Sequence, residues 1–292
     1  MFALTANKQA TRVRVINQGD VRNILRLIDT SWRVHIRISP VELAAKIQVM
    51  PGFLVEDHVG LRGFIMIEAQ RPNVALIIAA GLRDTWGIRP YLDLLAPEVE
   101  HAALAENLFT LVHIGGVSWL TEELWQRGFE TREWVVAFER RRNGSLPLPP
   151  QQPAFIRSAH RKDLSAILAL DGLAFDHIWR KSVGNFNAAL ASATSFSVAE
   201  MDHRVVGYAW CDMYRRHAHL TRLAVHPHYQ GYGIGAQLLH QALSDVLAQG
   251  ADLITLNTQE SNNRSQALYE RFGFVHNKQR MPVLWKDLAL SR

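Results

Sequence analysis

The sequence predicts an α/β or α+β protein built from two copies of one domain. Three observations support this prediction: a repeat relates the two halves of the 292 residues, a proline-rich segment separates them, and each half alternates short strands with amphipathic helices. Strands and helices in such an order form a sheet with helices on both faces. A single hydrophobic core also stops growing near ~250–300 residues, so a chain of this length is expected to form two domains.

The repeat rests on matching residues that occur in the same order in both halves. The offset between them stays between 143 and 145 residues, which favours a duplicated domain over chance similarity. The matching pairs are Arg14 and Arg157, Asp20 and Asp163, Phe53 and Phe196, Gly63 and Gly207, Thr110 and Thr255, and Leu124 and Leu268.

A proline-rich segment over residues 143–153 marks the predicted boundary. It holds four of the chain's 11 prolines, and such a segment can continue neither a helix nor a central strand. The predicted division is therefore a domain over residues 1–142, a linker over 143–153, and a second domain over 154–292.

The second half shows the order of elements most clearly. Apolar residues at helical spacing and short alternating runs give the following expected elements. They are a strand at 155–157, a helix from 164, an aromatic loop over 175–186, strands at 196–200, 205–213 and 217–225, a helix at 238–247, a strand at 253–257, a helix at 265–272 and a last strand pair ending near Trp285.

Composition excludes several classes of protein. With 48% hydrophobic and 20% charged residues, the chain is globular and not disordered. The single cysteine, Cys211, excludes a disulfide framework and a cysteine zinc site. The longest apolar run, 74–82, is shorter than a transmembrane helix requires, and the first residues lack the pattern of a signal peptide. A cytoplasmic protein without membrane contact is expected.

Charge gives little information about partners. The chain has 32 Lys and Arg against 27 Asp and Glu, a net charge of +5 that is spread along the sequence. No basic tract or interleaved aromatic stripe supports nucleic-acid binding. His226 and His228 resemble a metal-binding pair but have no acidic or cysteine partner nearby, so no metal is expected.

A glycine-rich segment over residues 230–236 suggests an anion site. It lies between a predicted strand and a predicted helix, where glycines permit positive φ and close approach of a ligand. The free N–H groups and dipole of a helix N-terminus favour a phosphate. A glycine turn that binds nothing is the alternative reading of this segment alone.

Two motifs together resemble the GNAT family of acyl-CoA-dependent N-acyltransferases. The first places Gln230, Gly233 and Gly235 in the family's cofactor motif, and the second runs from Asn262 through Tyr269 to Gly273-Phe274. The resemblance covers 154–290 strongly and 12–140 weakly, through the repeat. It implies two tandem GNAT-like domains, each a mixed, mostly antiparallel twisted sheet flanked by helices.

The resemblance also implies a cofactor and its contacts. Acetyl-CoA would bind as co-substrate, with its pantetheine beside the strand that ends at Val225 and its pyrophosphate on the glycine-rich segment. Tyr269 would protonate the departing thiolate. The residues expected to bind the cofactor are Leu223, Ala224, Val225, Gln230, Gly231, Tyr232, Gly233, Ile234, Gly235, Ala236, Asn257 and Asn262. Tyr269 could also be only a packing residue, and Asn262 only a helix cap.

The base and the acceptor site are less constrained by the motifs. Alternation along a strand predicts that His217, His219, Thr221 and Leu223 share one face. This strand is similar to that of the arylalkylamine N-acetyltransferase branch of the family, in which two histidines two residues apart act in proton removal. His219 matches the first of them, Thr221 stands at the second position, and a histidine titrates near neutral pH, so His219 is the leading candidate for the base, followed by His217 and Asp212. The acceptor wall in this family lies in the region of 175–186, so Phe175, Trp179 and Phe186 are the candidate specificity residues.

The first half departs from the cofactor motif. Only Gly87 survives of its glycines, Arg89 and Pro90 follow it, and Trp125 stands where the second half has Tyr269. We therefore expect a degenerate, non-catalytic N-terminal domain. The predicted function is an N-acetyltransferase that moves an acetyl group from acetyl-CoA to a small-molecule or protein amine by direct attack, in a monomer or homodimer. The alternative is a non-catalytic acyl-CoA-binding sensor.

Overall fold

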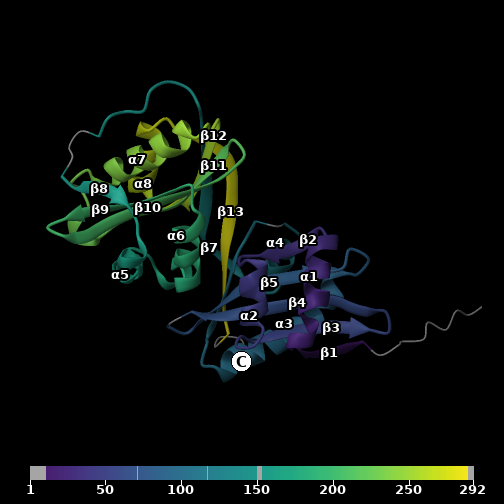
Figure 1. The fold of residues 1–292 in the computed structure, drawn as a ribbon. Coiled ribbons are helices and arrows are strands. Elements are labelled where there is room, and N and C mark those ends of the chain that lie inside the picture. Colours follow the sequence, from purple (N-terminus) through teal and green to yellow (C-terminus); the bar gives the residue numbers. More distant parts are fainter. Residues whose placement is uncertain (1–10, 71, 117, 150–152, 289–292) are drawn as a thin grey trace, which may run out of the picture. The chain divides into compact units, whose positions relative to one another are not determined.

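The computed structural model describes residues 11–70, 72–116, 118–149 and 153–288 of the chain. The chain forms two compact units (Figure 1). The N-terminal unit comprises Met1–Glu133 and Met281–Arg292, and the C-terminal unit comprises Trp134–Arg280. Each unit is a mixed sheet packed with helices, which confirms the predicted fold class.

The N-terminal unit is built around a long buried strand. Its elements are β1 (Arg12–Val15), α1 (Val21–Thr30), β2 (Arg33–Ile36), α2 (Pro40–Lys46), β3 (Gly52–Asp57), β4 (Gly60–Gln70), β5 (Val74–Leu82), α3 (Ile88–Ala105), β6 (Thr110–Ile114) and α4 (Ser118–Trp125). The strands lie in the order β1-β3-β4-β5-β6, and β2 also pairs with β5. Every residue of β5 is buried, which explains its uninterrupted apolar sequence.

Two glycines allow helices to approach both faces of this sheet. A Cβ atom on Gly63 of β4 would lie 2.7 Å from the ring of Tyr91 of α3. A Cβ atom on Gly81 of β5 would lie 2.7 Å from Leu27 of α1. Gly81 pairs with Phe64, the neighbour of Gly63, so the two glycines face opposite sides of the sheet. Helices α1 and α3 therefore cover opposite faces.

The C-terminal unit repeats this plan. Its elements are β8 (Phe155–Ser158), α5 (Leu164–Ala174), α6 (Val183–Ser192), β9 (Ser195–Met201), β10 (Arg204–Tyr214), β11 (His217–Val225), α7 (Ile234–Ala248), β12 (Leu253–Gln259) and α8 (Asn263–Arg271). The strands lie in the order β8-β9-β10-β11-β12, and only β11 and β12 run parallel. Helices α7 and α8 lie on one face and α5 and α6 on the other (Figure 1).

The two longest strands cross the boundary between the units. Strand β7 (Glu130–Arg141) pairs along β12, and its residues Val136 and Phe138 belong to the core of the C-terminal unit. Strand β13 (Val275–Asp287) pairs with β6, and Leu284 belongs to the core of the N-terminal unit. Each unit thus includes a strand from the other half of the sequence. This division differs from the one expected at 143–153, because matching repeats identifies the strands but not the sheet edge that accepts each one.

The same ion pair stabilises the start of both copies. Arg14 lies 2.7 Å from Asp20, and Arg157 lies 2.8 Å from Asp163, in the positions that the repeat matches. Each arginine also binds a glutamate on the next strand. The hydrogen bonds from arginine lower the pKa of both aspartates. The repeat found in the sequence is therefore a repeat of structure.

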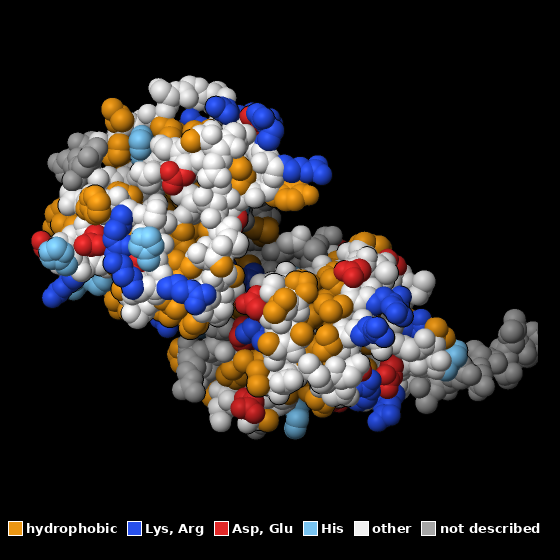
Figure 2. Space-filling model, in the orientation of Figure 1, with side chains coloured by type: hydrophobic (Ala, Val, Ile, Leu, Met, Phe, Trp, Pro, Cys, Tyr) orange, Lys and Arg blue, Asp and Glu red, His pale blue; other side chains and the backbone are white. Residues whose placement is uncertain are grey.

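The remaining features are consistent with the composition. Residues 143–149 form no helix or strand, as expected for the proline-rich segment, and 150–152 lie outside the described residues. On the face shown in Figure 2, Lys and Arg side chains are scattered over each unit and do not form one tract. Across the residues that the structure describes, no helix combines the length and hydrophobicity required to cross a membrane.

Candidate functional site

A cavity of about 430 Å³ lies at the predicted cofactor segment of the C-terminal unit. It is bordered by the end of β11, the loop after it, the start of α7, one face of α8 and Phe175. Its lining residues are Ala174, Phe175, Leu223, Ala224, Val225, Tyr229, Gln230, Gly231, Gly233, Gly235, Ala236, Asn262, Arg264, Ser265, Ala267, Leu268 and Arg271. Most of the predicted cofactor residues are therefore brought together at one place.

The end of β11 has an open backbone edge at this cavity. On one side β11 pairs with β10 as far as Val225. On the other side it pairs with β12 only over His217–Leu220, so the strands separate beyond Leu220. The backbone of Thr221–Val225 is thereby left for a strand-like ligand to pair with, as buried polar backbone groups require partners.

A β-bulge at Thr221 interrupts the alternation of side chains along β11. Trp210 lies opposite Arg222, whereas Cys211 lies opposite Leu220, so Thr221 is an extra residue. Leu223 consequently packs on the side of α7, whereas His219 lies opposite Asp212 on the other side. The prediction that His219 and Leu223 share a face is wrong, because a bulge shifts the side-chain period by one residue.

The loop and the first turn of α7 form the predicted anion cradle. Gly231 and Gly233 have φ angles of +96° and +87°, which only glycine adopts readily. The side chain of Gln230 holds the loop, since its amide donates to the carbonyl of Val225 at 3.0 Å. Gly233, Gly235 and Ala236 at the start of α7 line the cavity. The N–H of Ala236 donates to the carbonyl of Gly233 at 3.0 Å, whereas the N–H groups of Ile234 and Gly235 have no i−4 carbonyl within the helix.

Residues of the cradle contribute in different ways. The side chains of Ile234 and Ala236 are buried in the core, so only their backbone can reach a ligand. Tyr232 is exposed and is not part of the cavity lining. A Cβ atom on Gly235 would lie 3.6 Å from Leu268, in ordinary contact, so a longer side chain there would extend toward the cavity.

Two arginines at the cavity were not found from the sequence. Arg264 and Arg271 lie on α8 and line the cavity. Arg264 Nη1 donates to Gln230 Oε1 at 2.9 Å, which connects α8 to the cradle. A spacing of seven residues places both arginines with Leu268 on one helix face, and this spacing was the available signal. They supply positive charge beside the backbone cradle.

Helix α8 presents the second motif. Asn262 caps it by accepting a hydrogen bond from the Ser265 N–H at 3.1 Å, and it also lines the cavity. Tyr269 is buried against Phe138 and Phe274 and is not a lining residue. Burial raises the pKa of Tyr269 to about 12, and its hydroxyl is hydrogen-bonded to Ser265, which does line the cavity.

The histidines of β11 form a cluster with the neighbouring strands. His217 Nε2 and His219 Nδ1 each lie 2.9 Å from the hydroxyl oxygen of Thr255 on β12. Asp212 accepts hydrogen bonds from Thr221 at 2.5 Å and from the indole of Trp210 at 3.1 Å. Burial lowers the pKa of His219, although the nearby Asp212 opposes this shift. The lowered pKa favours the neutral form of His219.

Of the three residues predicted to form the acceptor wall, only Phe175 lines the cavity. Phe175 lines the cavity, and the guanidinium carbon of Arg222 lies 3.4 Å from the centre of its ring. Arg222 is in turn bound by the buried Asp171 at 2.6 Å. Phe186 is completely buried against Tyr208 and Trp210, whereas Trp179 is partly exposed.

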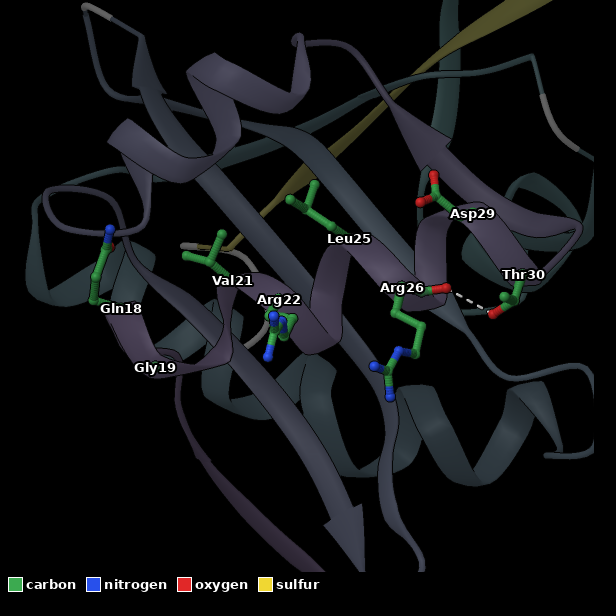
Figure 3. Close-up of a pocket in the computed structure, with 8 residues that line it drawn as sticks. All are labelled: Gln18, Gly19, Val21, Arg22, Leu25, Arg26, Asp29 and Thr30. Atoms are coloured by element: carbon green, nitrogen blue, oxygen red, sulfur yellow. Dashed lines mark hydrogen bonds between the residues drawn. The ribbon is translucent and has the colours of Figure 1, made fainter.

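Two other features do not join the site. Asn257 is exposed on β12, opposite Ala137 of β7 and away from the cavity lining. A larger depression of about 610 Å³ is lined only by residues of α1 and the turn before it (Figure 3). Its lining residues are Gln18, Gly19, Val21, Arg22, Leu25, Arg26, Asp29 and Thr30. It has no second element opposite the helix and no match to either motif.

The part of the sequence that forms the cavity matches a known protein family. Residues 164–274, which include both motifs, match the acetyltransferase (GNAT) family. The C-terminal half contains a GNAT-family domain. The matched region contains β11, the glycine cradle and α8, so the family resemblance noted in the sequence is confirmed for the C-terminal half.

Two curated proteins are similar in sequence to the chain, and one solved structure is similar in fold. A Bacillus subtilis protein, named as a candidate ribosomal protein bS18-alanine N-acetyltransferase, is 24% identical over 120 residues, which are 41% of this chain and 80% of that protein. The mycothiol acetyltransferase of Acidimicrobium ferrooxidans is 28% identical over 101 residues, a third of each chain. A tandem GNAT protein from the clavulanic acid biosynthesis pathway has a TM-score of 0.67 at 13% identity, and the match covers 96% of this chain and 99% of that one.

The N-terminal unit has the same strand arrangement as the C-terminal unit, but the edge of β5 that corresponds to the open edge of β11 is paired. Strand β5 pairs with β6 only over Val74–Leu76, as β11 does with β12. One edge of β5 pairs with β4 along its length. The other edge pairs with β6 as far as Leu76 and then with β2, which lies beside Ala79–Leu82. His35 of β2 then stacks on His113 of β6, with ring centres 4.5 Å apart. Strand β2 therefore occupies the edge of β5 that corresponds to the open edge of β11 in the C-terminal unit.

The cradle of the N-terminal unit is also altered. Gly87, which matches Gly233, precedes α3 with a φ of −74° instead of a positive value. Pro90 in the first turn has no N–H to offer. Trp125, which matches Tyr269, is exposed and donates its indole N–H to Thr131 at 2.9 Å.

Proposed function

We propose that the C-terminal unit transfers an acetyl group from acetyl-CoA to a primary amine by direct attack in a ternary complex. The observation that carries the proposal is the open edge of β11 leading directly to a helix N-terminus with two left-handed glycines. A strand-like pantetheine fits the open edge, and a pyrophosphate fits the N–H groups of the cradle. Arg264 and Arg271 would add charge attraction for the phosphates.

The backbone of β11 would also serve the chemistry. Leu223, Ala224 and Val225 line the cavity, and the backbone N–H groups on the open edge of this segment would bind the thioester carbonyl. Donors fixed in a protected site stabilise the negative charge that develops on this oxygen during attack. No nucleophile from the protein is required in this scheme, because the amine itself attacks the thioester.

His219 is the proposed base. An amine with a pKa near ~10 arrives as an ammonium ion, so it must lose a proton before it can attack. A neutral His219 can accept that proton, and Asp212 opposite it on β10 would stabilise the imidazolium that forms. Tyr269 keeps its proton at neutral pH and would donate it, through or beside Ser265, to the departing sulfur.

The acceptor would be a primary amine on a protein or a small molecule. The relatives carry names that specify an alanine of ribosomal protein bS18 in one case and mycothiol in the other. We therefore propose a test panel of primary amines that includes an alanine peptide with a free amine, an amine that carries a thiol, and simple alkylamines. Release of free CoA thiol with at least one amine, at a rate above acetyl-CoA hydrolysis, is the expected result.

A non-catalytic acyl-CoA sensor is the second candidate. It is favoured by one observation, that Tyr269 is buried and does not line the cavity. Calorimetry would detect acetyl-CoA binding in both cases. Tight binding without thiol release for any amine on the panel would support the sensor and contradict the enzyme.

We further propose that the N-terminal unit is non-catalytic and binds no CoA. The pairing of β2 with β5 and the proline in the first turn of α3 support this. Calorimetric titration of the whole chain with acetyl-CoA should give one site. A second site that survives disruption of the C-terminal cradle would overturn this proposal.

A further inference from the structure

The hydroxyl of Thr255 lies between two imidazoles. Its oxygen is 2.9 Å from Nδ1 of His219 and 2.9 Å from Nε2 of His217. A threonine hydroxyl has one hydrogen to donate, so it cannot donate to both rings. At least one of the two histidines must therefore donate an N–H to the Thr255 oxygen. The hydroxyl hydrogen then goes either to the other imidazole or to the carbonyl of Ala218, which lies 3.4 Å away.

The surroundings distinguish the two histidines. His217 is exposed at the start of β11, whereas His219 is largely buried. His219 is faced by Asp212 of β10, by His217 on its own strand and by Lys181 from the loop before α6. The Nε2 atom of His219 is the ring nitrogen that does not contact Thr255.

We propose that Thr255 is a positioning residue that holds His219 in the tautomer with a hydrogen on Nδ1. In this arrangement His219 Nδ1–H donates to Thr255 Oγ1, and the Thr255 hydroxyl donates to Nε2 of His217. The Nε2 atom of His219 then carries a lone pair and takes the proton from the acceptor ammonium, which leaves a neutral amine and an imidazolium. This inference rests on the proposed acetyl transfer, because it assigns a supporting residue to its base.

The other strand partners make the assignment specific. Thr255 is the residue of β12 that lies opposite His219 in the parallel register. Thr258, three residues on, is buried on the same strand and pairs with Val136 of β7. It thus provides a matched control for the loss of a threonine hydroxyl from β12.

The test compares Thr255→Val, Thr255→Ser and Thr258→Val. We expect Thr255→Val to lower kcat at least tenfold, since a misplaced base forfeits part of a contribution of ~10²–10⁴. Its affinity for acetyl-CoA should stay within about twofold of the wild type, because Thr255 lies outside the cofactor cavity. Thr255→Ser should restore most of the activity, and Thr258→Val should retain it.

A second measurement needs no substrate. Nitrogen-15 NMR of the free protein should show His219 as the Nδ1–H tautomer, and Thr255→Val should remove this preference while Thr255→Ser keeps it. A wild-type His219 with its hydrogen on Nε2 would overturn the inference, as would equal kcat and equal pH profiles for the valine and serine variants. If the wild type releases no thiol with any amine, the proposed function fails, and the NMR result still decides the tautomer.

Discussion

Strands β5 and β11 begin in the same way and end differently. Each pairs with a parallel neighbour for only three or four residues and then separates from it. In the N-terminal unit the opened edge of β5 is taken by β2, so its backbone groups are satisfied within the chain. In the C-terminal unit the edge of β11 borders a cavity. The duplicated fold therefore reproduces the separation of the two strands, but the edge of β5 is paired with β2, whereas the edge of β11 borders the cavity.

The largest expected effect concerns the strand that β7 contributes to the C-terminal unit. A chain of residues 143–292 lacks β7, so β12 would have an unpaired edge and the core would lose Phe138. We expect this fragment to lack a cooperative unfolding transition in near-UV circular dichroism, whereas a chain of 130–292 should regain at least part of it. A folded 143–292 that binds acetyl-CoA like the full chain would contradict the importance of the exchanged strand.

The next effect concerns the cradle itself. Gly235→Arg places in the C-terminal unit the residue type that Arg89 provides in the N-terminal one, and its side chain would extend toward the cavity. We expect acetyl-CoA binding to weaken by at least 100-fold in calorimetry, with the melting temperature little changed. Gly235→Ala is the control, since its Cβ atom makes only ordinary contacts. Unchanged affinity of the arginine variant would exclude the cradle as the phosphate site.

The closed edge of the N-terminal unit should make its stability depend on pH. Burial, with a contribution from Arg37, lowers the pKa of His35 to about 4, and His113 beside it is also shifted down. The folded pKa lies below the unfolded value of 6.5, so the stabilisation is complete above pH 6.5 and is lost as the pH falls toward 4. The loss for His35 is about 3 kcal/mol.

Denaturant unfolding at several pH values would measure this dependence. His35→Phe retains a ring against His113 but cannot be protonated, so the difference between wild type and variant should shrink or reverse as the pH falls from 7 to 4. If the free energy of unfolding changed with pH in the same way for both proteins, His35 would not be buried between β2 and its neighbours.

The smallest expected effect concerns Tyr269. Tyr269→Phe keeps the packing against Phe138 and Phe274 and removes only the hydroxyl. We expect kcat to fall about tenfold, within the range of general acid catalysis, while acetyl-CoA affinity stays near normal. Turnover equal to that of the wild type would remove Tyr269 from the proposed chemistry and leave it as a core residue.

Much of the site could be found from the sequence because it depends on local backbone requirements. Gly231 and Gly233 occupy left-handed positions that other residues adopt poorly, and Asn262 is a typical helix cap, so each leaves a signal in its own segment. Arg264 and Arg271 left only a weak signal, since arginines on an exposed helix face are common. The bulge at Thr221 left none, because it depends on how β10 pairs with β11.

The sequence by itself determined the duplication, the fold class, the glycine cradle and the family of the C-terminal half, because these follow from repeat matching and short-range conformational preferences. Only the tertiary structure decided which strand fills which sheet edge. The exchange of β7 and β13, the insertion of β2 beside β5, and the meeting of His217, His219 and Thr255 all join segments that lie far apart in the chain. Which strands pair depends on the relative free energies of all the possible strand arrangements, so it cannot be predicted from any one segment of the sequence.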